Sequence, residues 1–153
     1  MEKERAEHNK ELERIRATFF RETESYKIKL KKSEFLFERQ FEAASQLVAL
    51  IRNLMPYYSY PHMDWEDVCE HFALQMADVE QELDKYLSRH GAVLSNGVID
   101  KIGYCIGIAG ENKFNVNGPD VSDTAKKEAE KLYRELVEAE ELLLKEVHTQ
   151  IST

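Results

Sequence analysis

The apolar positions of the chain follow a helical pattern from Glu2 to Met55, and this stretch contains no glycine and no proline. The glycines all come later, and the first proline is Pro56. Proline lacks the amide donor that continues a helix and disfavours helical geometry at the residue before it. Because no other helix-ending signal occurs, we predict one long helix over residues 2–55.

The spacing of apolar residues changes along this predicted helix. Its first half has steps that alternate between three and four, as in a coiled-coil seam, with Glu22 as a polar interruption; the apolar members are Leu12, Ile15, Phe19 and Tyr26. In the second half the apolar stripe drifts, and from Phe37 it broadens, as in a helix packed in a globular core; its members are Phe41, Ala44, Leu47, Val48, Ile51, Leu54 and Met55. We therefore expect an arm over residues 1–34 that continues into a bundle domain over residues 35–153.

Two more helices have clear start signals. Asp64 is a suitable N-cap, and Asp67 completes a capping box. The apolar row that follows predicts a single helix, which ends at Gly91 in the left-handed conformation; the row comprises Trp65, Val68, Phe72, Met76, Val79, Leu83, Tyr86 and Leu87. The last helix begins near Ser122 or Asp123, and its inner row comprises Ala125, Ala129, Leu132, Leu136, Ala139, Leu143 and Val147.

A short glycine-rich helix is predicted after Ser95 or Asn96. Its apolar residues have helical spacing, although each internal glycine costs about 1 kcal/mol relative to alanine. Gly103, Gly107 and Gly110 share one face, which favours close approach to the backbone of a neighbouring helix. A ligand-binding loop is the alternative interpretation.

These elements predict an all-α fold, an antiparallel bundle of three long helices and one short glycine-rich helix. At about 1.5 Å per residue the first helix would be roughly 80 Å long, and the other long helices only about 40 Å. About half of the first helix would then extend beyond the bundle, with its apolar seam in water. We therefore expect a homodimer through Leu12, Ile15, Phe19 and Tyr26.

Charge is high and unevenly distributed. Charged residues make up 33% of the chain and the net charge is −8. Residues 1–34 are nearly balanced, so the excess of acid lies in the bundle, which makes nucleic acid an unsuitable partner. Lysines between Lys27 and Lys32 could dock to an anionic membrane, although a solvated helix face also explains them. No stretch has the length of a membrane span, and two cysteines without a signal peptide predict a cytoplasmic protein.

Candidate catalytic or metal-binding residues are few. Asp67 and His71 are four residues apart on a predicted helix and, with Glu70, could reach one metal ion. An acidic first turn followed by an ordinary helical histidine explains the same residues. No phosphate-binding loop, nucleophile motif or paired-cysteine zinc motif occurs, so we expect no cofactor and do not favour an enzyme.

An aromatic loop between the first two helices is the second candidate interaction surface. Tyr57, Tyr58 and Tyr60 lie within a few residues, and tyrosine is frequent at binding hot spots. The same rings could instead cover the end of the bundle.

Two segments resemble a set of uncharacterised bacterial proteins: residues 30–44, LKKSEFLFERQFEAA, and residues 58–65, YSYPHMDW. The resemblance covers about residues 27–110. It implies a bacterial origin and a helical fold, and it assigns no functional residue. We expect a non-enzymatic interaction and oligomerisation protein; a metal-binding bundle or metal-dependent enzyme that uses Asp67 and His71 is the alternative.

Overall fold

The computed structural model describes residues 1–54, 62–114 and 122–151, and all regular structure in these ranges is helical. Helix α1 spans Glu2–Leu54, α2 Trp65–Ala73, α3 Met76–His90, α4 Asn96–Asn112 and α5 Asp123–Ile151. A short 3-10 helix, η1, spans Gly91–Val93. No strand occurs in the described ranges, so the predicted all-α class is confirmed. Pro56, expected to end the first helix, lies outside them.

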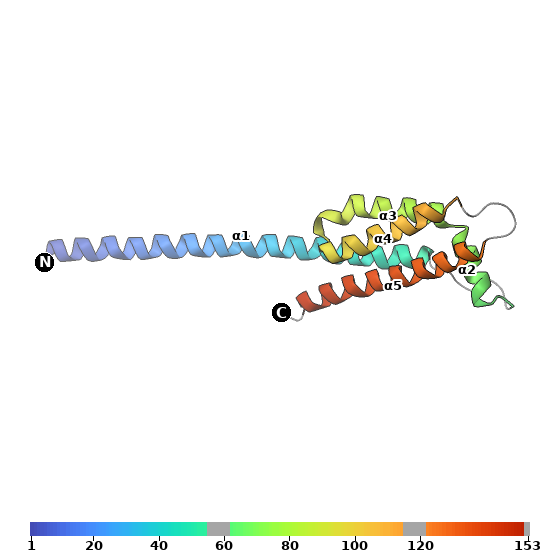
Figure 1. Ribbon diagram of the computed structural model, residues 1–153. Helices are drawn as coiled ribbons and strands as arrows, with labels where there is room; N and C mark the ends of the chain where they lie inside the picture. Colours follow the sequence, from blue (N-terminus) through green and yellow to red (C-terminus); the bar gives the residue numbers. More distant parts are fainter. Residues whose placement is uncertain (55–61, 115–121, 152–153) are drawn as a thin grey trace. The chain divides into compact units, whose positions relative to one another are not determined.

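The chain divides into two compact units, and the division falls within α1 (Figure 1). The N-terminal unit, Met1–Glu38, consists of helix alone, and none of its side chains is buried. The C-terminal unit, Arg39–Thr153, contains the remainder of α1 and all the other helices.

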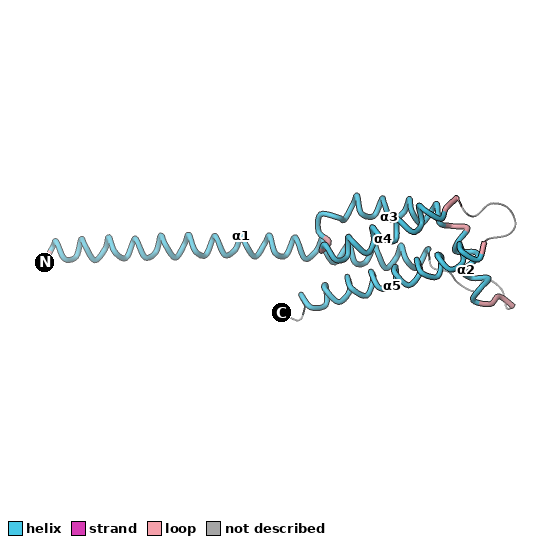
Figure 2. The backbone as a smooth tube through the Cα atoms, in the orientation of Figure 1, coloured by secondary structure: helices cyan, strands magenta, loops and turns pink. Residues whose placement is uncertain are grey.

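Within the C-terminal unit, α4 contacts both α3 and α5, and α2 contacts α5 (Figure 2). The inner row predicted for the last helix is buried throughout α5. The core also contains large apolar side chains from the other helices; those with almost no exposure include Leu47, Ile51, Val68, Phe72, Met76, Val79, Leu83, Val98, Ile102 and Cys105.

Side-chain hydrogen bonds join the end of α1 to α3. Tyr86 donates its hydroxyl proton to the carbonyl oxygen of Ala43 at 2.6 Å. His90 Nε2 lies 2.7 Å from Gln46 Oε1. Ala43 and Ala44 are buried, whereas Phe41 is 53% exposed. The expectation that Phe41 lies in the core is therefore wrong: small alanines face the core, and the rings of α3 approach the backbone of α1.

The single helix predicted after Asp64 is two helices. The capping box is present, because Asp64 Oδ1 accepts from the Asp67 amide at 2.8 Å and Asp67 Oδ2 from the Asp64 amide at 3.2 Å. Leu74 and Gln75 then separate α2 from α3, although neither is a helix breaker. Since α2 contacts α5 while α3 contacts α4, the change of direction lets each segment meet its own neighbour.

The last two helices begin where predicted, and a serine side chain caps the start of each. The Val98 amide donates to Ser95 Oγ at 3.3 Å, and the Ala125 amide donates to Ser122 Oγ at 3.1 Å. Both bonds satisfy amides that lack a partner within the helix. Gly91 differs from the prediction: its φ is −54°, in the right-handed region, and it begins η1 instead of ending α3 in a left-handed turn.

Gly103, Gly107 and Gly110 of α4 do not mediate close helix packing, so that expectation is also wrong. A Cβ atom at Gly103 or Gly107 would have no heavy atom within 4 Å. At Gly110 it would lie 2.5 Å from Glu80 Oε2, the end of a flexible side chain. Glu80 also forms an ion pair with Lys113 at 3.0 Å. Gly110 therefore makes room for a carboxylate, and the other two glycines face open space.

Candidate functional site

The apolar seam of the N-terminal unit is exposed along its whole length. Leu12 is 39% exposed, Ile15 59%, Phe19 70% and Tyr26 66%. Thr23 donates to the Phe19 carbonyl oxygen at 2.8 Å, which is a bond within the helix and does not cover the ring. The predicted seam residues therefore lie on one helical segment with much of their apolar surface free to contact a partner.

Phe20 belongs to this surface and was not among the predicted interaction residues. It is 66% exposed and lies next to Phe19 in the sequence. With Ile15 and Phe19 it lines an open recess of about 420 Å³, whose lining also includes Arg16 and Lys27. The seam spacing does not include Phe20, because Phe20 falls one position outside the seam. The sequence feature that indicates Phe20 is the adjacent pair Phe19-Phe20.

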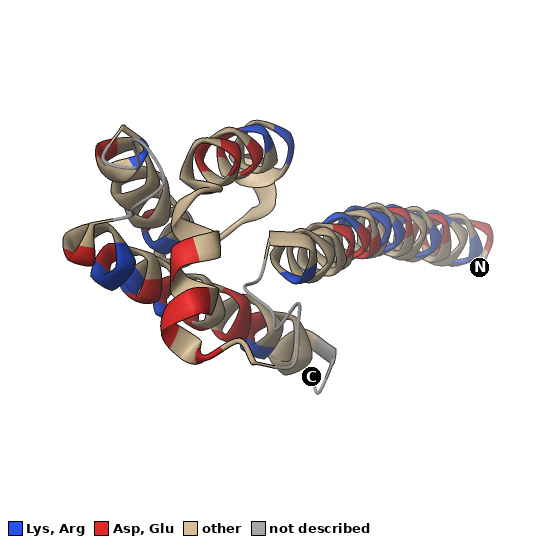
Figure 3. Cartoon of the chain, turned by 90° about the vertical axis from the view of Figure 1, so that its right-hand side faces the viewer, with Lys and Arg blue, Asp and Glu red and all other residues tan. Residues whose placement is uncertain are grey.

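Charged residues of both signs are interspersed along the N-terminal unit (Figure 3). Lys27 and Glu24 form an ion pair at 3.6 Å with both side chains exposed. Such exposed pairs contribute little to stability. Lys29, Lys31 and Lys32 are exposed as well. The basic segment is thus accessible, with acids close by in the sequence.

The predicted metal ligands lie on α2. Asp67 is half-buried, and one of its carboxylate oxygens accepts the capping bond from Asp64. Glu70 is half-buried and His71 is exposed. In the described part of the chain, no group of three or more His, Cys, Asp or Glu side chains is placed to hold a metal ion. The other candidate surface, formed by Tyr57, Tyr58 and Tyr60, lies outside the described residues.

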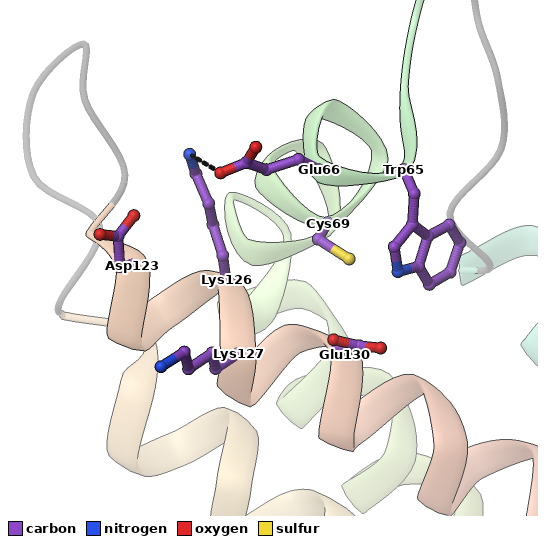
Figure 4. A pocket seen from close by; sticks show the side chains of 7 residues that line it. All are labelled: Trp65, Glu66, Cys69, Asp123, Lys126, Lys127 and Glu130. Atoms are coloured by element: carbon purple, nitrogen blue, oxygen red, sulfur yellow. Dashed lines mark hydrogen bonds and ion pairs between the residues drawn. The ribbon is translucent and has the colours of Figure 1, made fainter.

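A pocket of about 340 Å³ lies between α2 and the start of α5 (Figure 4). Lys126 Nζ reaches across it to Glu66 Oε1 at 3.4 Å. Trp65 lies at its edge and makes an edge-to-face contact with Tyr133, with ring centroids 5.5 Å apart. The lining residues carry both signs of charge: Glu66, Asp123 and Glu130 are acidic, and Lys126 and Lys127 are basic. This mixture does not select an anionic or a cationic ligand.

The Cys69 side chain also lines this pocket, but its environment opposes nucleophilic chemistry. Burial, and next the negative charge of Glu130, raise the pKa of the Cys69 thiol. Burial raises the pKa of the Cys105 thiol to about 12. Since the thiolate is the nucleophile, neither cysteine is activated at neutral pH.

Comparisons with known proteins identify no relative. No protein-family description, curated protein or solved structure matches this chain significantly. The resemblance to uncharacterised bacterial proteins therefore stays a prediction. Among the described residues, no helix is both long enough and apolar enough to cross a bilayer.

Proposed function

We propose that this chain is a non-enzymatic interaction protein that forms homodimers through residues 12–26 of α1, as a coiled-coil arm. In this proposal residues 35–153 form an antiparallel bundle, and the loop with Tyr57, Tyr58 and Tyr60 binds a second protein. The supporting observation is the exposed row of four large apolar side chains on a segment without a buried residue.

The size of this apolar row is consistent with a reversible dimer. Full burial of a large apolar side chain stabilises by about 1.5–3 kcal/mol, so covering a partly exposed one contributes on the order of 1 kcal/mol. Eight such side chains from two copies contribute of order 10 kcal/mol. Association costs roughly 4–15 kcal/mol in lost translational and rotational freedom. The two terms are comparable, so we expect a dimer that dissociates on dilution.

A matched pair of substitutions tests the proposal. Ile15 is in the seam and 59% exposed; Ile28 is 52% exposed on the same segment but outside the seam spacing. Ile15→Lys places a charge in the dimer contact, so we expect a monomer where wild type is a dimer. Ile28→Lys makes the same chemical change and should leave the dimer intact. Sedimentation velocity over a dilution series measures both.

Two results would contradict the proposed function. One is a wild-type chain that stays monomeric at every concentration tested. The other is an Ile15→Lys variant with the same dimer dissociation constant as Ile28→Lys. Circular dichroism of both variants should show equal helix content, since lysine and isoleucine differ little in helix propensity.

A further inference from the structure

We propose that the two copies pair in antiparallel orientation, with the two-fold axis between residues 20 and 21. Glu11 of each copy then meets Lys32 of the partner subunit. This inference rests on the proposed homodimer and adds its orientation and register. The charged residues along the seam supply the argument, because like charges that face each other oppose pairing.

A parallel, in-register pair has two unfavourable layers. The apolar row itself passes from Tyr26 to Leu30, whereas a strict heptad places the next seam position at Lys29. In that heptad the six seam positions include Glu22 and Lys29. In a parallel pair each seam residue faces its own copy. Glu22 would face a glutamate and Lys29 a lysine, both within the contact. The one favourable flanking pair, Glu11 with Arg16 of the partner subunit, leaves both like-charge layers in place.

The antiparallel pair removes both like-charge layers. With the axis between residues 20 and 21, Ile15 meets the partner's Tyr26 and Phe19 meets the partner's Glu22. Leu12 meets the partner's Lys29, whose aliphatic stem can cover it. No charged seam residue faces a residue of its own sign. Glu11 and Lys32, which flank the seam on one side, become neighbours of opposite charge, and symmetry forms this pair twice.

The exposure of these groups leaves them available for the proposed contacts. Glu11, Glu22, Lys29 and Lys32 are all exposed in the N-terminal unit. An antiparallel pair shifted by one heptad toward the C-terminus would centre on residue 24 and lose the Glu11–Lys32 pairs. One shifted by a heptad toward the N-terminus would centre on residue 17 and bring Arg16 opposite the partner's Arg16. That repulsion favours the register with Glu11 next to the partner's Lys32.

Charge reversal distinguishes the orientations. Glu11→Lys and Lys32→Glu should each raise the dimer dissociation constant by about tenfold at low ionic strength, because each converts two attractive pairs into repulsive ones. The double variant Glu11→Lys/Lys32→Glu should return to within about twofold of wild type. The double variant Glu11→Lys/Arg16→Glu is the matched control, and it should stay weak. Sedimentation equilibrium measures all four.

Recovery in the control double variant would overturn the antiparallel orientation in favour of a parallel pair. Absence of recovery in both double variants would overturn the proposed register and its ion pairs. These failures differ from failure of the proposed function, because Ile15→Lys would still separate a dimeric wild type into monomers. Residues 11 and 32 are 21 positions apart on one helix, so recovery cannot come from a contact within a chain.

Discussion

Substitution of the glycines in α4 tests whether the exposed face of this helix is unoccupied. Alanine in place of an internal helical glycine stabilises by about 0.5–1 kcal/mol when the site has room, mainly because the unfolded chain loses freedom. Gly103 and Gly107 have room, since a Cβ atom there meets nothing within 4 Å. We therefore expect Gly103→Ala and Gly107→Ala each to increase the free energy of unfolding by roughly 0.5–1 kcal/mol.

Gly110→Ala is the matched control on the same helix. Its Cβ atom would lie 2.5 Å from Glu80 Oε2, so the carboxylate must move. The move disturbs the ion pair of Glu80 with Lys113, which is 3.0 Å long and about a quarter exposed at each side chain. A partly exposed pair contributes at most about 1 kcal/mol. The stabilisation by alanine and the weakening of the Glu80–Lys113 ion pair therefore offset each other. We expect the free energy of unfolding of Gly110→Ala to stay close to that of wild type.

Urea unfolding, followed by the fluorescence of Trp65, the one tryptophan of the chain, measures these changes in the free energy of unfolding of the C-terminal unit. Equal gains at all three positions would show that Glu80 moves without cost. Destabilisation by about 1 kcal/mol or more at Gly103 or Gly107 would refute the reasoning, because it would mean that another group packs against this face.

Two further predictions concern the contacts between α1 and α3. Tyr86→Phe removes the 2.6 Å bond to the Ala43 carbonyl oxygen without opening a cavity, so we expect a loss of about 0.5–1.5 kcal/mol in urea unfolding; an unchanged midpoint would contradict this. For His90, burial lowers the pKa, against the charge of Glu42, which raises it. As pH falls below about 6.5, the unfolded chain therefore binds a proton before the folded chain does, and stability decreases. His90→Gln should remove this part of the pH dependence between pH 7 and 5.5, and parallel pH profiles for the two proteins would argue against it.

Several features of the candidate interaction surface were predictable from the sequence. The alternation of steps of three and four identified Leu12, Ile15, Phe19 and Tyr26, and the structure places all four exposed on α1. Helix starts were predictable where a serine or aspartate precedes an apolar row, because such caps act on amides a few residues away. Phe20 was missed because the chosen spacing excludes neighbours of seam residues. Dimerisation itself stays a prediction.

Local signals determined the all-α class, the caps at Asp64, Ser95 and Ser122, and the buried face of α5, because helical spacing and capping depend on residues within a few positions of each other. Tertiary contacts decided the rest. The break at Leu74 depends on α2 and α3 meeting different helices, and the burial of Ala43 in place of Phe41 depends on Tyr86, more than forty positions away. The role of Gly110 depends on Glu80 of another helix. These three features depend on contacts with residues that are distant in the chain, and the periodicity of a single segment carries no information about such contacts.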